Sequence, residues 1–223
     1  MHRDDELKCR IEAHLRAFDV RAQSTENRQH AAVVIAVVDE GRGAELPGMA
    51  APAHGWSEAA ALILTRRSAT LRNHAGQWAL PGGRLEPGES PETAALRELA
   101  EEVALQLDEN SEGCVLGRLD DFVTRSGFVI TPVVVWAGAA RVLTPNAAEV
   151  ASIHRIPIDE FLRADAPVLE SLEGSAHPVL KMPVGDSWIA APTAAILYQF
   201  RELCLEGRAT RVAHFEQPTF AWK

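Results

Sequence analysis

Apolar residues recur with a helical period at the start of the chain. Four of them, three or four positions apart, predict a helix over residues 4–18: Leu7, Ile11, Leu15 and Phe18. A second helix is predicted over residues 191–207 (APTAAILYQFRELCLEG), ending at Gly207. A short helix is expected over residues 159–162.

Continuous apolar runs predict the strands. They occupy residues 29–38, 60–65, 114–123 and 128–136; residues 78–83 predict a short strand ending in a turn, and residues 149–158 a strand and loop. The runs at 114–123 and 128–136 are joined around the turn sequence TRSG, so they are predicted to pair antiparallel. Residues 39–55 are rich in glycine and proline and predict a long, mobile loop.

The order of these elements indicates the fold class. Strands come before, between and after helices without regular alternation, which predicts an α/β (α+β) protein with a mixed sheet and helices on both faces. We divide the chain into an N-terminal helix and extension (1–28), a main domain (29–207) and a C-terminal tail (208–223).

Composition narrows the class of protein. The 223 residues include 47% hydrophobic and 24% charged residues, as is ordinary for globular chains, and no apolar run is long enough to span a membrane. The N-terminus is charged, unlike a secretory signal. Cys9, Cys114 and Cys204 are far apart, which is typical of a reducing compartment. We therefore predict a cytoplasmic protein without a membrane partner. The sequence leaves the oligomeric state open, a homodimer being one possibility.

Charge is distributed unevenly along the chain. The net charge of −9 disfavours nucleic-acid binding. Residues 84–112 hold nine acids and two bases, a local charge of −7, whereas residues 65–76 hold three arginines and no acid. Two readings stay open: two solvated faces, or a cation-binding acidic cluster beside an anion-binding arginine cluster.

The acidic block contains a predicted helix with a carboxylate stripe. Ser90 is a good N-cap and Pro91 suits the first helical position. Glu98, Glu101 and Glu102 fall within an arc of about 100°, opposite an apolar stripe. If half-buried, such an arrangement is stabilised by a hard divalent cation, because carboxylates are the ligands that Mg²⁺ and Mn²⁺ prefer. A solvated glutamate-rich face is the alternative.

The whole stretch resembles the Nudix box, the signature of Nudix hydrolases. Gly83 is followed after five residues by Glu89, and after seven more by Arg97-Glu98-Leu99-Ala100-Glu101-Glu102. Ala104 stands where the family has glycine, a change that shapes how the helix ends but removes no ligand. The resemblance implies a Nudix-type α/β/α sandwich with a mixed β-sheet and the Nudix loop-helix.

The resemblance also implies roles for individual residues. Glu98, Glu101, Glu102 and the carbonyl of Gly82 would bind Mg²⁺ or Mn²⁺. Arg97 would orient Glu101, and Glu89 would either brace the loop or assist the attacking water. The implied reaction is attack by water on a diphosphate linkage, in which metals neutralise phosphate charge and lower the pKa of bound water.

The stretch before the box resembles the additional motif of coenzyme A diphosphatases within this superfamily. Residues 63–83 (ILTRRSATLRNHAGQWALPGG) match it closely, and residues 124–134 and 146–150 match more loosely. The residues expected to bind substrate are Arg66, Arg67, Ser68, Arg72 and Gly83. Guanidinium groups suit the diphosphate and 3′-phosphate of coenzyme A, although these arginines could instead pair with acids such as Glu86 or Glu89.

The expected function is therefore metal-dependent hydrolysis of coenzyme A or acyl-CoA to 3′,5′-ADP and 4′-phosphopantetheine or its acyl derivative. The alternatives are another nucleotide substrate, such as ADP-ribose, NADH or an oxidised nucleotide, or a non-catalytic nucleotide-sensing domain. Glu149 is either an additional ligand or general base, or a surface acid. Trp78 either stacks on adenine or belongs to the core.

Overall fold

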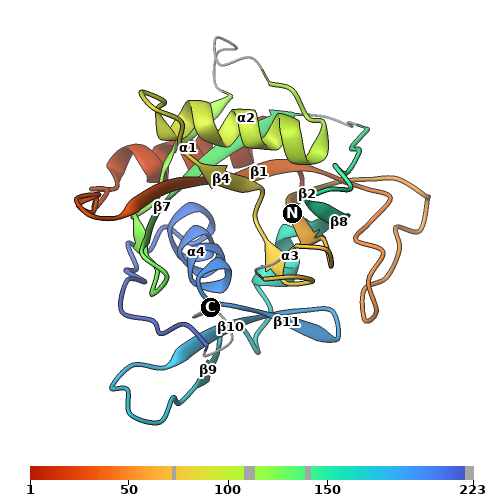
Figure 1. The fold of residues 1–223 in the computed structure, drawn as a ribbon. Coiled ribbons are helices and arrows are strands. Elements are labelled where there is room, and N and C mark those ends of the chain that lie inside the picture. Colours follow the sequence, from red (N-terminus) through yellow and green to blue (C-terminus); the bar gives the residue numbers. More distant parts are fainter. Residues whose placement is uncertain (72–73, 108–113, 139–141, 219–223) are drawn as a thin grey trace.

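The main sheet is built around two long central strands. The structure is a computed structural model and describes residues 1–71, 74–107, 114–138 and 142–218 (Figure 1). The strands of the main sheet are β1 (Gln29–Gly41), β2 (Ser57–Arg67), β3 (Trp78–Ala79), β4 (Gly82–Arg84), β5 (Val115–Arg118), β6 (Phe122–Val123), β7 (Phe128–Gly138) and β8 (Val150–Pro157). Their order is β3-β2-β1-β7-β5, with β4 paired to β1, β6 to β7 and β8 to β2. Only the β1–β7 pairing is parallel among these described strands, so the predicted mixed sheet is confirmed.

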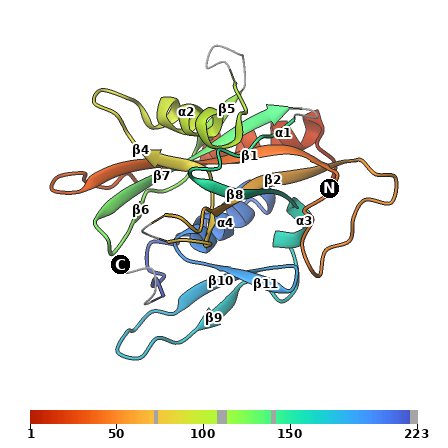
Figure 2. The ribbon, with the colours of Figure 1, turned by 45° about the vertical axis from the view of Figure 1, so that its right-hand side comes forward.

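Helices cover both faces of this sheet, as predicted. They are α1 (Asp5–Ala17), α2 (Pro91–Val103), α3 (Ile158–Phe161) and α4 (Thr193–Phe200), which continues as the π-helical η1 (Arg201–Leu205). Figure 2 shows α2 on one side of the sheet and α4 on the other. The helix predicted over 191–207 is thus present, and Gly207 follows it with a positive φ of 69°. No helix in the described part of the chain is long and apolar enough to cross a membrane.

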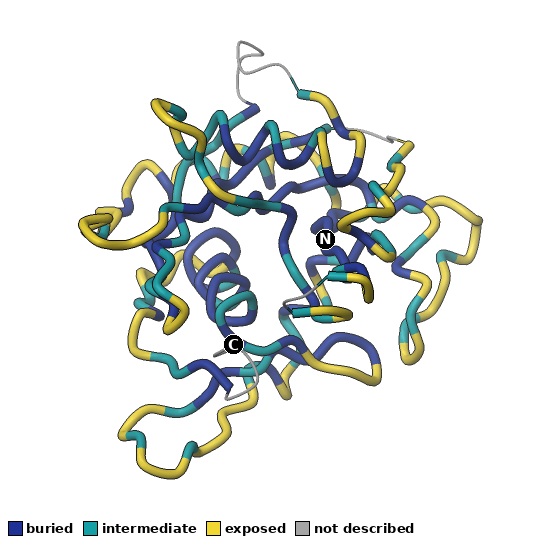
Figure 3. The backbone as a smooth tube through the Cα atoms, viewed as in Figure 1, coloured by how far each residue is buried: buried dark blue, intermediate teal, exposed yellow. Residues whose placement is uncertain are grey.

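The alternation of side chains along β1 explains the two layers. Val34 and Ala36 face α2, in a core that includes Leu99, whereas Ile35 and Val37 face the core that contains α1 and α4. Both faces are apolar because successive residues of a strand point to opposite sides and each side is covered. Figure 3 shows the resulting burial along the sheet and exposure in the peripheral loops.

Two predicted strands are interrupted in the structure. The run at 78–83 is divided between β3 and β4 around Pro81, which has no N–H for a ladder hydrogen bond. The run at 114–123 is divided between β5 and β6. Apart from these breaks the pairing of β5 and β6 with β7 is antiparallel, as expected.

The sequence patterns did not predict a second, three-stranded sheet. It comprises β9 (Val168–Glu170), β10 (Val179–Val184) and β11 (Ser187–Ala190), in the order β11-β10-β9. Figure 2 shows it beyond α4, on the side away from α2. Its strands are short and β9 is exposed throughout, so they lack the long apolar runs that marked the main sheet.

The N-terminal helix packs into the main core. Leu7, Ile11 and Leu15 of α1 are buried in the core on the α4 side of the sheet. Val212, beyond the last helix, is buried in the same core. The division of the chain at residues 28 and 207 stays a prediction.

Candidate active site

Helix α2 begins as the sequence predicts. The Ser90 hydroxyl accepts a hydrogen bond from the Thr93 N–H at 3.1 Å, and Pro91 is the first helical residue. In the loop between β4 and α2, the Glu86 N–H donates to the Glu89 carboxylate at 2.8 Å. This loop is therefore fixed at both of its ends, immediately before the acidic stripe of α2.

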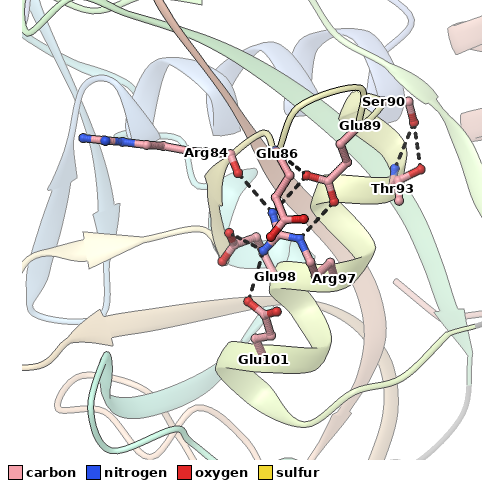
Figure 4. A network of polar contacts seen from close by, with 8 residues as sticks. All are labelled: Arg84, Glu86, Glu89, Ser90, Thr93, Arg97, Glu98 and Glu101. Atoms are coloured by element: carbon pink, nitrogen blue, oxygen red, sulfur yellow. Dashed lines mark hydrogen bonds and ion pairs between the residues drawn. The ribbon is translucent and has the colours of Figure 1, made fainter.

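Arg97 connects this loop to the helix (Figure 4). Its Nε and Nη2 donate to the two Glu89 oxygens at 2.9 and 3.1 Å, and Nη2 also donates to the Arg84 carbonyl at 3.0 Å. Its Nη1 donates to Glu98 at 2.9 Å and to Glu101 at 3.1 Å. The pairing with Arg97 lowers the pKa of Glu89, and the same pairing raises the pKa of Arg97. The guanidinium thus fixes three carboxylates at once, which a lysine ammonium has no geometry to do.

Two of the three stripe carboxylates are buried. Glu98 is 8% exposed and Glu102 is 4% exposed, whereas the Glu101 side chain is 55% exposed. Burial raises the pKa of Glu98 and raises that of Glu102 to about 8, because a charged carboxylate loses its hydration. The charge of Glu149 adds to both shifts, so this acid lies close to the buried pair although its own side chain is exposed.

The two glycines that begin β4, Gly82 and Gly83, are named here the glycine turn and lie between β1 and these acids. A Cβ on Gly83 would lie 2.1 Å from Oε1 of Glu98, and a Cβ on Gly82 would lie 2.3 Å from the Ala32 carbonyl oxygen. Both distances are far below contact, so only glycine lets the chain pass between β1 and α2. A backbone hydrogen bond from Gly82 also lowers the pKa of Glu102, against the larger effect of burial.

The two described arginines upstream make no ion pair with a described acid. The Arg66 guanidinium lies 3.8 Å from the centre of the Trp78 ring and donates to the Gly76 carbonyl at 3.1 Å. The Arg67 Nε is buried without a hydrogen-bond partner among the described residues. Within the described residues neither arginine forms an ion pair with Glu86 or Glu89, and Glu89 is held by Arg97 instead.

Two other residues were predicted to bind substrate, Arg72 and Ser68. Arg72 lies outside the described residues. The Ser68 side chain is buried, its hydroxyl lies 2.9 Å from that of Thr70, and its N–H donates to the Glu149 carbonyl at 2.7 Å. Ser68 thus connects the arginine segment to Glu149 and lines neither of the two cavities that flank Trp78.

Those two cavities adjoin each other. The first, of about 250 Å³, is named here the glycine-turn pocket; its lining includes Arg67, Gly82, Gly83, Phe128 and Ile196. The second, of about 320 Å³, is named the hairpin pocket; its lining includes Arg66, Gly76, Trp188 and Ala190. Gln77, Trp78, Pro192 and Thr193 line both. Trp78 is itself only 8% exposed and belongs to the core, as one of the two alternatives for it predicted.

Comparison with known proteins identifies the family. The NUDIX domain model matches residues 28–172. The chain belongs to the Nudix family. An uncharacterized Nudix hydrolase named NudL from Photorhabdus laumondii is 33% identical over 181 residues, which cover 80% of this chain and 86% of that protein. A NudL from Pectobacterium atrosepticum is 37% identical over 169 residues, which cover 70% and 86%. Among solved structures, a MutT/nudix family protein from Enterococcus faecalis is 16% identical with a TM-score of 0.46, over 75% of this chain and 52% of that one.

Nudix hydrolases generally use divalent metal ions, and the residues of this turn and helix fit such an ion. Glu98 and Glu102 are both buried; burial and the charge of Glu149 oppose the ionisation of each, and the charge of Glu98 further opposes that of Glu102. Carboxylates beside a glycine carbonyl form an all-oxygen donor set of the kind that Mg²⁺ and Mn²⁺ prefer. Within the described ranges, no three acidic, histidine or cysteine side chains already converge in ligating geometry. Arg97 donates to both Glu98 and Glu101.

The one departure from the Nudix box is a strained position. Ala104 ends α2 in the left-handed region, with a φ of 57°, where a residue with a Cβ is disfavoured. We expect Ala104→Gly to raise the free energy of unfolding by about 1 kcal/mol, because glycine adopts this conformation without strain. Thermal unfolding would show a rise in Tm of about 2–4 °C. An unchanged or lower Tm would contradict this account of the helix end.

The buried Glu102 predicts a pH-dependent stability in the metal-free protein. Its folded pKa of about 8 exceeds the ordinary value of 4.5, so the folded state holds a proton more tightly than the unfolded state. Stability from this group is therefore present at low pH and is lost as pH rises from about 5 to about 8. Each pKa unit is worth about 1.4 kcal/mol, so the loss is on the order of a few kcal/mol. Denaturant titrations at several pH values measure the free energy of unfolding. As pH rises, this free energy should increase for Glu102→Gln relative to the wild type, and it should not increase for the exposed Glu101→Gln.

The sequence missed several residues of these pockets. Phe128 and Ile130 follow the TRSG turn, Thr193 and Ile196 lie on α4, and Trp188 lies on β11. The TRSG stretch and the 191–207 helix were noticed as elements, but no local pattern says that their side chains meet at Trp78. For Trp188 the sequence carried no signal at all.

Proposed function

We propose that this Nudix protein hydrolyses the diphosphate linkage of coenzyme A or acyl-CoA, yielding 3′,5′-ADP and 4′-phosphopantetheine or its acyl derivative. The observation that carries the proposal is the position of Arg66 and Arg67. Both belong to the stretch that resembles the coenzyme A diphosphatase motif, both line pockets beside Trp78, and neither pairs with a described acid. Cationic side chains left unpaired beside a diphosphate-cleaving centre suit a ligand with several phosphates.

In the proposed reaction, the turn and α2 hold the scissile linkage beside the buried acids. Glu98, Glu101, Glu102 and the Gly82 carbonyl would hold the divalent ions, which when bound neutralise phosphate charge and activate water. Arg97 positions Glu98 and Glu101, and Glu89 in turn braces Arg97. Gly83 allows the close approach of the turn to Glu98.

Substrate placement falls to the upstream segment. Arg67 lies near enough to Glu102 to lower the pKa of that acid, so a phosphate on Arg67 would also be near the carboxylates. Catalysis of this kind needs placement and charge rather than a covalent nucleophile, because the leaving group is a phosphate. Ser68 and Arg72 are proposed to contribute through the same segment.

The test is a substrate panel with Mg²⁺ and with Mn²⁺, with products identified by mass spectrometry. The panel contains coenzyme A, an acyl-CoA, ADP-ribose, NADH and an oxidised nucleotide. We expect the highest kcat/KM for coenzyme A or its acyl derivative. If ADP-ribose is cleaved at least tenfold faster than coenzyme A, the proposed substrate is wrong. If no member of the panel is turned over, a nucleotide-sensing role is favoured.

A further inference from the structure

The hairpin pocket is separate from the carboxylates and shares part of its wall with the glycine-turn pocket. Its lining includes no residue of the acidic stripe, whereas the glycine-turn pocket reaches Gly82 and Gly83. Trp78, Gln77, Pro192 and Thr193 are common to both linings. The two pockets are therefore neighbours that meet at these shared residues.

A cation without a described acidic partner lines the hairpin pocket. Arg66 stacks on Trp78 and uses Nη1 for the Gly76 carbonyl. Burial lowers the pKa of the Arg66 guanidinium, and no acid of the described residues acts in the opposite direction. A phosphate beside Arg66 would supply the missing negative charge, and the planar guanidinium has further N–H groups to donate to it.

An exposed aromatic ring also lines the hairpin pocket. Trp188, on β11, is 45% exposed, and the Lys181 ammonium lies 4.1 Å from its ring centre. Large exposed aromatics beside cations are typical of sites that stack a base next to a phosphate. Trp188 and Arg66 come from different sheets, so their meeting in one pocket is a product of the tertiary fold.

The glycine-turn pocket has a different chemistry. Phe128, Ile130, Ile196 and Leu80 line much of it, and its accessible surface is mainly apolar. Such a lining suits an aliphatic chain with few charges. The hairpin pocket, with its arginine and exposed aromatic ring, suits the charged nucleotide half of coenzyme A. The apolar glycine-turn pocket suits the aliphatic half.

We propose that the hairpin pocket binds the nucleotide half of the substrate, with adenine stacked on Trp188 and a phosphate on Arg66. The aliphatic half then occupies the glycine-turn pocket. This assignment rests on the proposed function, which identifies the two halves as those of coenzyme A. For any other adenine nucleotide, Trp188 and the β10–β11 hairpin would still determine specificity.

The test is calorimetric binding of the separate halves: 3′,5′-ADP, 5′-AMP and 4′-phosphopantetheine. We expect Trp188→Ala to weaken 3′,5′-ADP binding about tenfold, as loss of one base stack does, and to leave 4′-phosphopantetheine binding within about twofold. Arg66→Gln should weaken binding of the two nucleotides and leave 4′-phosphopantetheine binding unchanged.

Two control variants accompany these. Trp188→Phe keeps an aromatic ring, and its affinity for 3′,5′-ADP should stay within about threefold of the wild type, which separates loss of stacking from disruption of the hairpin. Trp56→Ala is the matched control, because Trp56 is 42% exposed and lines neither pocket.

The outcomes distinguish a failure of this nucleotide-site proposal from a failure of the proposal that coenzyme A is the substrate. Unchanged 3′,5′-ADP and 5′-AMP affinities in Trp188→Ala would overturn the nucleotide site, even if coenzyme A is cleaved. If the wild type prefers ADP-ribose in the substrate panel while Trp188→Ala weakens 5′-AMP, the nucleotide site stands and the coenzyme A assignment fails. Wild-type protein that binds none of the nucleotides would also overturn the site.

Discussion

Glu102→Gln is expected to lower kcat by about 10²–10³-fold while leaving the fold intact. Loss of one preorganised electrostatic contact at a reacting phosphate has effects of this size. Glutamine keeps the shape of the side chain but removes the charge that would hold a divalent ion, and Glu102 is the more deeply buried of the two inner acids. Steady-state kinetics in Mg²⁺ and Mn²⁺, together with a calorimetric titration of Mn²⁺, measures both consequences.

The matched control for this variant is Glu92→Gln. Glu92 lies in the first turn of the same helix and pairs with Arg118, away from the inner acids. Its kcat should stay within about twofold of the wild type, because this half-exposed ion pair does not touch the inner acids. Turnover by Glu102→Gln equal to that of the wild type, or equal losses in the two variants, would refute a ligand role for Glu102.

Arg97→Ala is expected to have the largest effect on stability, lowering the free energy of unfolding by about 3 kcal/mol. The substitution leaves Glu89 and Glu98, whose side chains are only 8% and 11% exposed, without their shared cation. Removing one partner of a buried pair costs much more than the pair itself contributes, because a charge stays buried and unpaired. Urea denaturation at pH 7 measures the loss, and activity should fall with it because Glu98 loses its anchor.

Arg163→Ala provides the comparison for this variant. Arg163 also contacts two acids, Glu160 and Asp165, but the Asp165 side chain is 58% exposed. Its loss should cost less than about 1 kcal/mol, because solvent screens the exposed charges. The free energy of unfolding of Arg97→Lys should lie between those of the wild type and Arg97→Ala. An ammonium keeps the charge but cannot form the bidentate pair with the two Glu89 oxygens. Equal costs for Arg97→Ala and Arg163→Ala would contradict the view of Arg97 as the cation on which the buried Glu89 and Glu98 side chains depend.

Much of the site was predictable because it is local. Ser90, Pro91 and the spacing of the acids define the start and the faces of α2 within a few turns, and the structure places them accordingly. The contact between Arg97 and Glu101 follows from helical geometry, since residues four apart are neighbours. Gly82 and Gly83 stand where the turn must approach another chain segment closely.

Other features depended on contacts between distant segments. Helical geometry puts Glu101 and Glu102 on one stripe, but the packing of α2 against β1 and β4 decides that Glu102 is buried and Glu101 is exposed. The sequence could not decide whether Arg66 and Arg67 pair with nearby acids. In the structure Glu89 is taken by Arg97, so both arginines line pockets instead.

By itself the sequence determined the family-defining turn and helix, the kinds of ligand atoms they present, and the two apolar faces of the main sheet, because each depends on periods and caps a few residues long. Only the tertiary structure decided which acids lose their hydration and which side chains share a pocket. Arg66 and Trp188 are far apart in the chain, and their meeting beside Trp78 results from the packing of the β10–β11 hairpin and α4 beside β2 and β3. No short-range pattern encodes such an approach, because strand pairing and packing at long range set it.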